Sequence, residues 1–218
     1  MKKTLLLIQP GRLGDIILCL PIVKHYVDKG YEVDWYCPKE YHSLFRNISY
    51  CTPISKVIKN YYDVIDLSFG FGGPPESWWQ ITYPRWDSFV HAKYHLAQVP
   101  LDEKWNLVWD RDQEREDALF KELNLPKEYI VYHPQGSRES FALDLPNNYY
   151  ALEFKKQGDY NIFDWYRVLA EAAEIHCIDS VLVNFVDSAL PDFEPKVFHS
   201  VQNYKRPDLT VKKGWIIK

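Results

Sequence analysis

Asp15 lies where a strand-like apolar run, a pair of glycines and a second apolar run meet. Residues 8–21 read IQPGRLGDIILCLP, so Gly11, Arg12, Gly14 and Asp15 fall between the two runs. A glycine turn from a strand into a helix leaves backbone N–H groups and the positive end of the helix dipole pointing outward, which suits an anion such as phosphate. A carboxylate at the same corner could act as a general base that accepts a proton from a hydroxyl group.

Two plainer interpretations of this corner remain open. Asp15 could cap the helix, since Asp is a favoured N-cap residue that contributes roughly 1 kcal/mol there. The glycines could instead belong to a dinucleotide-binding turn, with Asp34 at about the right separation for a ribose contact. That turn requires a third glycine two residues after Gly14, where Ile16 stands, so the sequence disfavours an NAD site.

Short apolar runs alternate with longer segments of helical period along the whole chain, which predicts an α/β fold of parallel sheets covered by helices. Strands are expected at 4–9, 31–37, 55–59, 62–68, 128–133, 148–154, 175–179 and 196–200. Helices are expected at 15–30, 39–47, 86–98, 110–126, 162–174 and 180–190. Residues 204–218 are expected to form an extension packed by Trp215.

Composition narrows the class of protein. The 218 residues carry a net charge of −4, and their Lys and Arg residues are scattered, so no nucleic-acid partner is expected. No stretch approaches the roughly 18 apolar residues that a membrane span needs, and the amino-terminal apolar run is too short for a signal peptide, so a cytoplasmic protein is expected. The four cysteines show no metal-ligand spacing, so neither a metal nor a cofactor is expected.

The stretch GRLGDIILCLPIVKHY at 11–26 resembles the amino-terminal signature of the heptosyltransferase-like glycosyltransferases of family nine. The resemblance implies the GT-B architecture, in which two Rossmann-like halves face each other across a cleft. It also implies metal-independent, inverting transfer from a nucleoside-diphosphate sugar to a hydroxyl of a glycan or lipid-linked acceptor. In that family the Asp of the Gly-Asp pair deprotonates the acceptor, which implies this role for Asp15, with Gly11, Arg12 and Gly14 on the substrate side.

Two later stretches are similar to the donor-binding segments of the same family. In 172–190 a strand ends in Asp-Ser before a helix, which implies that Asp179, Ser180 and Val181 hold the donor phosphates. Backbone N–H groups at a helix start and a hydroxyl donor suit that task. Helix capping by Asp179 or Ser180 is the plainer alternative.

The stretch YIVYHPQGS at 129–137 resembles the strand that opens the family's donor domain. This similarity implies that Gly136, Ser137 and Arg138 line the diphosphate side, although Arg138 could simply be solvated. His133 before its proline is interpreted as a residue that packs at the strand end.

The interval between Gly136 and Asp179 is shorter than in the family, which implies a reduced second half. We therefore expect an amino-terminal acceptor-side domain at 1–110 and a reduced donor-side domain at 111–218. Glu153, at the end of an expected strand, is the candidate ribose contact by its position alone. A non-catalytic relative that binds a sugar nucleotide or a glycan, or a subunit of a larger transferase, is the alternative function, and the oligomeric state is open.

Three tryptophans in the stretch PESWWQITYPRW, at 75–86, are the acceptor-side candidates. The rings of Trp78, Trp79 and Trp86 could stack on sugar faces. They could equally cover the edge of the sheet as part of a local core.

Overall fold

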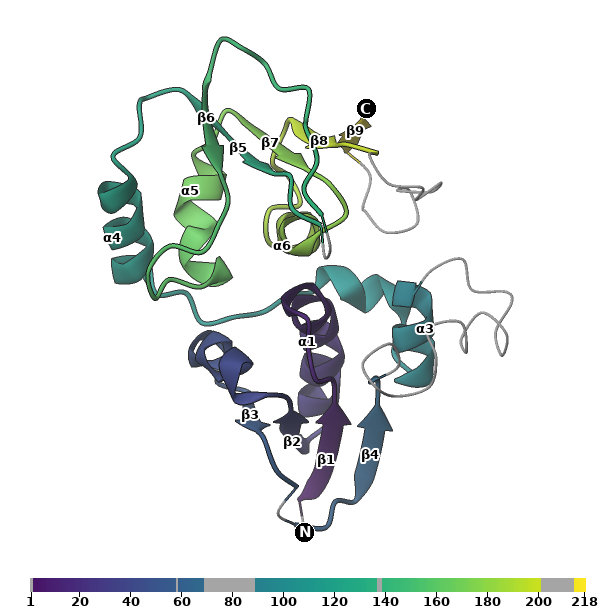
Figure 1. Cartoon of the computed structure of the whole chain (residues 1–218). Coiled ribbons are helices and arrows are strands. Elements are labelled where there is room, and N and C mark those ends of the chain that lie inside the picture. Colours follow the sequence, from purple (N-terminus) through teal and green to yellow (C-terminus); the bar gives the residue numbers. More distant parts are fainter. Residues whose placement is uncertain (1, 58, 69–88, 137–138, 201–213) are drawn as a thin grey trace. The chain divides into compact units, whose positions relative to one another are not determined.

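A computed structural model of the chain describes residues 2–57, 59–68, 89–136, 139–200 and 214–218. Internal contacts divide the chain into two compact units, Met1–Asp110 (unit 1) and Arg111–Lys218 (unit 2). Each unit has its own parallel sheet accompanied by helices (Figure 1). The α/β class predicted from the sequence is therefore confirmed.

The sheet of unit 1 has the strand order β3-β2-β1-β4, with all pairs parallel. Its strands are β1 (Lys3–Ile8), β2 (Tyr31–Tyr36), β3 (Cys51–Ile54) and β4 (Asp63–Asp66). Strand β1 pairs on both sides, so that Leu5 lies opposite Val33 and Asp63. Both Leu5 and Leu7 are fully buried, as expected for a central strand of a parallel sheet.

Helices α1 and α3 of unit 1 lie side by side. The helical segments of this unit are α1 (Leu13–Asp28), α3 (Phe89–Leu96) and the 3₁₀ helices η1 (Lys39–Asn47) and η2 (Leu101–Trp105). The hydroxyl of Tyr94 donates to the carbonyl of Leu18 at 2.9 Å, and that of Tyr26 donates to the carbonyl of Ala97 at 2.7 Å. These bonds tie α1 to α3 and to the chain just beyond it.

The strand expected at 55–59 was wrong, because the third strand of the sheet is Cys51–Ile54. This strand contains Pro53, and a proline argues against a strand in sequence analysis because it has no N–H to donate. Strand β3 lies at the edge of the sheet, however, and pairs only with β2. An edge strand tolerates proline when the missing donor would face away from its neighbour.

The sheet of unit 2 is also parallel throughout, with the order β6-β5-β7-β8-β9. Its strands are β5 (Tyr129–His133), β6 (Tyr150–Glu153), β7 (Glu174–Cys177), β8 (Lys196–Phe198) and β9 (Trp215–Ile217). Its helical segments are α4 (Gln113–Leu123), η3 (Ile162–Trp165), α5 (Tyr166–Ala170) and α6 (Val181–Ala189). The helix expected over 162–174 ends early, since the N–H of Ala173 already donates to the carbonyl of Tyr129 at 2.8 Å.

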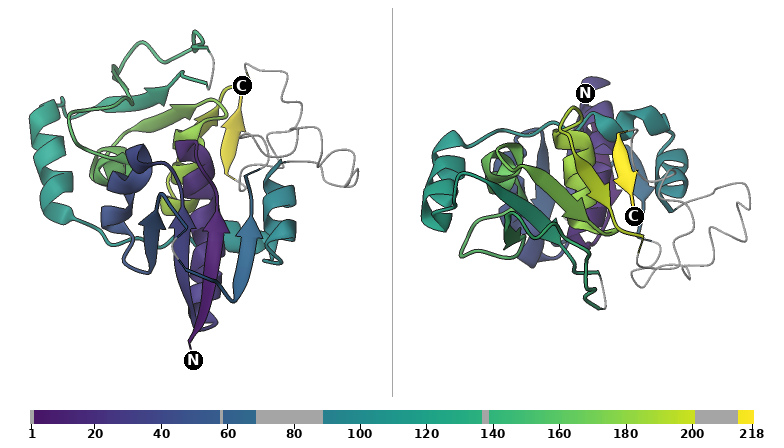
Figure 2. Two further views of the ribbon diagram at one scale, coloured as in Figure 1. Left: turned by 60° about the horizontal axis from the view of Figure 1, so that its bottom comes forward. Right: turned by 90° about the horizontal axis from the view of Figure 1, so that it is seen from above.

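The carboxyl-terminal extension contains a fifth strand that sequence analysis did not predict. Strand β9 pairs with β8 and forms one edge of the sheet (Figure 2). Trp215 does pack, as expected, because its ring lies edge-on to Phe198 and its Nε1 donates to Asp187 Oδ1 at 2.9 Å. Asp187 is fully buried, so this bond satisfies a carboxylate that would otherwise lack one of its partners.

All four cysteines, Cys19, Cys37, Cys51 and Cys177, are free and buried. Burial raises the pKa of the Cys19 thiol and of the Cys37 thiol to about 12. It raises the pKa of Cys51 and Cys177 as well. The thiols therefore behave as small apolar groups in the two cores.

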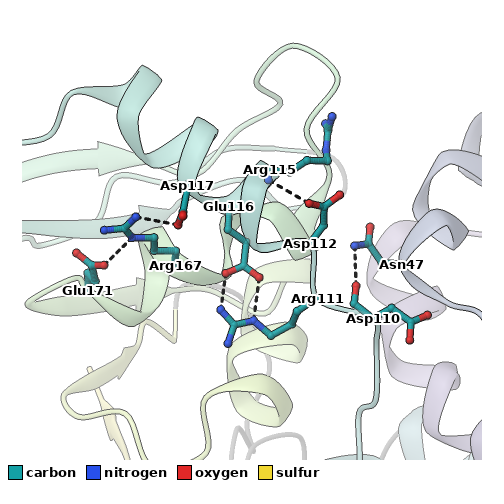
Figure 3. A network of polar contacts seen from close by, with 9 residues as sticks. All are labelled: Asn47, Asp110, Arg111, Asp112, Arg115, Glu116, Asp117, Arg167 and Glu171. Atoms are coloured by element: carbon teal, nitrogen blue, oxygen red, sulfur yellow. Dashed lines mark hydrogen bonds and ion pairs between the residues drawn. The ribbon is translucent and has the colours of Figure 1, made fainter.

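The boundary between the units falls between two anchored neighbours. The side-chain amide of Asn47 donates to the carbonyl of Asp110 at 3.0 Å, which holds Asp110 in unit 1. Arg111 donates from Nε and Nη2 to the two carboxylate oxygens of Glu116 (Figure 3). Its Cζ also lies 4.1 Å from the centroid of the Tyr166 ring, and both contacts hold Arg111 in unit 2. The chain thus passes from one unit to the other at a single peptide bond.

Replacing Arg111 with Met should destabilise unit 2, because Glu116 is only 1% exposed and would lose its counter-charge. A buried carboxylate without its partner costs about 2–3 kcal/mol. The midpoint of urea denaturation followed by circular dichroism measures the effect. The matched control is Arg167→Met, whose partners Asp117 and Glu171 are nearly half exposed, and it should change the midpoint little. Equal effects of the two substitutions would contradict the prediction.

Candidate functional site

The residues predicted from the first glycine turn gather at one corner of unit 1. Strand β1 ends at Ile8 and helix α1 begins at Leu13, so the glycine turn occupies the carboxyl edge of the parallel sheet. Gly11 and Arg12 lie in the turn, and Gly14 and Asp15 lie in the first turn of α1. This edge is where ligands bind in open α/β sheets.

Gly11 is required at its position by the close approach of Tyr41. Its φ is +131°, and a Cβ added there would lie 2.5 Å from Tyr41 Cε2. Real Cβ atoms do not approach that closely, and side chains rarely adopt this backbone conformation. The turn can therefore run against the tyrosine ring only because residue 11 has no side chain.

The capping interpretation of Asp15 was wrong. The N-cap residue of α1 is Arg12, and its side chain makes no capping hydrogen bond. Asp15 is the third residue of the helix, where a negative charge interacts favourably with the helix dipole. Its side chain is 16% exposed, so it is mostly buried but still has some contact with solvent.

Sequence analysis missed Lys93, which lies next to Asp15 on the buried side of its carboxylate. The Lys93 side chain is fully buried, and its Nζ is 3.9 Å from Asp15 Oδ1. A signal was present in the sequence: Lys93 is three residues after Val90 and four before Ala97, both buried, so it occupies the apolar face of α3. A lysine at such a position is buried only when polar groups meet its ammonium.

The structure gives the dinucleotide interpretation no support. Ile16 is fully buried where a third glycine would have to stand. Asp34 lies inside β2 rather than at its end, and it accepts hydrogen bonds from Tyr61 Oη at 2.7 Å and Lys59 Nζ at 2.8 Å. Its role is to pair with these neighbours.

The donor-side candidates of unit 2 that the structure describes lie along one edge of its sheet. Glu153 ends β6 opposite Tyr132, and Cys177 ends β7 opposite His133, so the three strands finish at the same edge. Gly136 follows β5, and its N–H donates to the carbonyl of Glu139 at 2.8 Å. Asp179, Ser180 and Val181 make the turn from β7 into α6, with Ser180 as the N-cap and Val181 as the first helical residue.

The side chain of Ser180 does not cap its helix, although the residue occupies the N-cap position. Its Oγ lies 2.8 Å from Nδ1 of His133 instead. His133 also packs edge-on against Phe154, as expected of a strand-end residue. Burial lowers the pKa of His133 to about 4, so the imidazole is neutral at pH 7 and holds the hydroxyl by a hydrogen bond alone. The first N–H groups of α6 are consequently not capped by the Ser180 hydroxyl.

Several candidates lie outside the described residues. These are Ser137 and Arg138 on the donor side, and Trp78, Trp79 and Trp86 on the acceptor side. Among the residues that the structure does describe, no group of three or more His, Cys, Asp or Glu side chains is placed to hold a metal ion. In the same residues, no helix has both the length and the apolar character needed to cross a bilayer.

Comparison with solved structures gives likenesses of fold at low sequence identity. The family 9 glycosyl transferase of Veillonella parvula matches with a TM-score of 0.64 and 10% identity, over 99% of this chain and 85% of that one. The E. coli heptosyltransferase WaaC, solved with ADP-2-deoxy-2-fluoro heptose, matches with a TM-score of 0.54 and 14% identity, over 99% and 92%. The E. coli ADP-heptose lipopolysaccharide heptosyltransferase II matches with a TM-score of 0.50 and 12% identity, over 100% and 90%.

Sequence comparison adds no relative: no protein-family model and no curated protein matches the chain. The solved structures nevertheless confirm the resemblance predicted from the sequence as a likeness of fold. The fold of this chain is therefore similar to the folds of these solved glycosyltransferases.

The stability of the protein should fall as the pH is lowered from about 6.5 to about 4, partly because of His133. Its folded pKa of about 4 lies below the ordinary histidine value of 6.5, so the unfolded chain binds the proton first as the pH falls. The stabilisation is therefore complete above pH 6.5, and by pH 4 about 3 kcal/mol is lost. Urea denaturation across this pH range should show a shallower decline for His133→Asn than for the unmodified chain. The remaining decline belongs to other groups, including His176 and His199, whose pKa values burial also lowers. Parallel curves for the two proteins would contradict the assignment.

Proposed function

We propose that this chain is a glycosyltransferase that moves a sugar from a nucleoside-diphosphate sugar to a hydroxyl of a glycan or lipid-linked acceptor. One observation carries the proposal: a partly exposed carboxylate, Asp15, stands in the first turn of α1 at the carboxyl edge of the sheet. It does so in a fold shared with structures solved with ADP or an ADP-heptose analogue. The acceptor is assigned to unit 1, residues 1–110, and the donor to unit 2, residues 111–218.

In the proposed reaction, Asp15 takes the proton of the acceptor hydroxyl. The acceptor oxygen then forms a bond with the anomeric carbon, and the bond between that carbon and the phosphate oxygen breaks. The electron pair of the broken bond leaves with the nucleoside diphosphate. This is a single displacement, so it inverts the anomeric centre, and no metal ion takes part. A positioned base of this kind contributes about 100-fold to 10,000-fold to the rate.

The leaving group is proposed to lie at the start of α6. Backbone N–H groups at this helix terminus suit a diphosphate. In the tautomer in which His133 Nδ1–H donates to Ser180 Oγ, the hydroxyl proton of Ser180 is left to donate to the phosphate. Asp179 and Val181 complete the turn, and Glu153 at the end of β6 is assigned to the ribose. Fixed donors of this kind stabilise the charge that develops on the departing phosphate.

The remaining candidates are assigned to the surroundings of Asp15, to the diphosphate and to the acceptor. Gly11, Arg12 and Gly14 are proposed to line the substrate side of the base. Gly136, Ser137 and Arg138 are assigned to the diphosphate, for which a guanidinium offers paired donors. Trp78, Trp79 and Trp86 are assigned to the acceptor, because indole rings stack on sugar faces.

The substitution Asp15→Asn should abolish transfer without unfolding the protein. ADP-heptose is the donor to use first. The measurement is the rate of ADP release, with water alone and with each of a panel of glycans as the acceptor of the sugar. We expect the rate to fall about 100-fold or more, while ADP still binds, since the donor is assigned to unit 2. The matched control is Asp28→Asn at the exposed end of the same helix, which should keep full activity. Undiminished ADP release by Asp15→Asn would refute the base.

Replacing Ser180 with Ala should weaken ADP binding roughly tenfold, because one hydrogen bond to a charged phosphate is lost. Isothermal titration of the whole chain with ADP measures the change. Ser188→Ala, near the other end of α6, is the control and should leave the affinity unchanged. Equal affinities for all three proteins would refute the donor assignment. Binding of ADP by the unmodified chain with no release from any donor and acceptor would favour a non-catalytic sugar-nucleotide binder.

A further inference from the structure

Lys93 is a fully buried ammonium group beside the proposed base. Helix α3, which carries it, lies against α1 (Figure 1). Lys93 Nζ donates to Gln9 Oε1 at 3.0 Å and to the carbonyl of Leu67 at 3.0 Å, and it lies 3.9 Å from Asp15 Oδ1. A buried charge is strongly unfavourable unless it is both paired and hydrogen-bonded. Lys93 meets both conditions.

The partner atoms are fixed by a second set of hydrogen bonds. Gln9 is fully buried, and its Nε2 donates to the carbonyl of Gly11 at 2.9 Å. The amide oxygen of Gln9 must therefore face Lys93, because a flipped amide would set two donors against each other. Trp35 Nε1 donates to the main-chain carbonyl of Gln9 at 2.9 Å, which anchors the residue to β2. Gln9 thus connects the Lys93 ammonium to the backbone of the glycine turn.

The atoms that contact Lys93 suit an ammonium group. The two atoms at 3.0 Å are oxygens that can only accept, which matches an ammonium group with its three donors. Burial lowers the pKa of Lys93 below its usual value, and interactions with Cys19, Asp15 and Asp66 offset only part of this shift. The Cys19 thiol nearby is neutral at pH 7, since burial raises its pKa to about 12. The compensating negative charge therefore comes from the two carboxylates.

We propose that Lys93 is a positioning residue that keeps the Asp15 carboxylate ionised and oriented toward the acceptor. This inference rests on the proposed function of Asp15 as the base. The ammonium is fully buried and lies 3.9 Å from Asp15 Oδ1, whereas the Asp15 side chain keeps part of its surface exposed, where the acceptor hydroxyl is proposed to meet it. Among the residues that the structure describes, Asp66, Glu40, Arg12 and Tyr41 also interact with groups at this corner. Arg12 is exposed, and burial raises the pKa of Tyr41, so neither of them replaces the buried ammonium.

The first test is the pH dependence of ADP release from ADP-heptose by Lys93→Met. An opposite charge at this distance favours the ionised carboxylate by about 1–3 pH units. The acidic limb of the kcat profile should therefore move to higher pH by that amount, while the affinity for ADP stays unchanged. The control is Lys24→Met, which removes an ion pair on the exposed face of α1 and should leave the limb in place. If Lys93 served the fold alone, its loss would lower the denaturation midpoint and leave the acidic limb where it was.

The second test needs no substitution of Lys93 and no substrate. The coupling between two titrating groups is reciprocal, so removal of the Asp15 charge must destabilise the Lys93 ammonium to the same extent. In 15N NMR of the lysine side chains, the Lys93 Nζ signal should lose its proton at a pH about 1–3 units lower in Asp15→Asn than in the unmodified chain. Identical titration of Lys93 in the two proteins would overturn the inference.

The two proposals fail in different ways. Full ADP release by Asp15→Asn would overturn the proposed function. Loss of ADP release in Asp15→Asn, combined with an unmoved acidic limb in Lys93→Met, would leave the base in place and overturn the role of Lys93 alone.

Discussion

The parallel pairing of β1 between β2 and β4 is the constraint on which the candidate base depends. A central parallel strand has neighbours on both sides and is covered on both faces. After the last residue of β1 the chain turns within a few residues into α1. The turn is tight because Gly11 passes against Tyr41. Asp15 is therefore delivered to the carboxyl edge in the first helical turn, and α3, which packs on α1, brings Lys93 behind it.

The two units solve the problem of a buried ionisable group in opposite ways. In unit 1 the cost of burying Lys93 is offset by acceptor oxygens and by the carboxylate of Asp15. In unit 2 His133 is buried against Phe154 with a hydroxyl as its hydrogen-bond partner, and it gives up its charge. Lys93 places a positive charge beside the Asp15 carboxylate, whereas His133 is a neutral group that orients the Ser180 hydroxyl by a hydrogen bond.

Local sequence signals predicted most of the architecture, since a strand, a glycine turn and an amphipathic helix are all encoded within a few residues. The position of Asp15 follows from that kind of signal. The contact between His133 and Ser180 could not be predicted, because the residues are 47 positions apart and meet only when β5 and β7 pair. Strand β3 was misplaced because Pro53 masks it, and β9 was missed because three residues carry too little periodicity. Lys93 was overlooked because a lysine is ordinarily assigned to the solvent side of a helix.

Because every cysteine is buried, the folded chain should not react with thiol reagents. Maleimides and disulfide-forming oxidants react with accessible thiolates, and Cys19, Cys37, Cys51 and Cys177 offer neither the access nor the ionised form at neutral pH. A cysteine introduced on the surface of each unit would then be the sole site of coupling for a fluorophore or spin label. Because Asp110 and Arg111 are held by different units, a pair of such labels would measure the distance between the two units in solution.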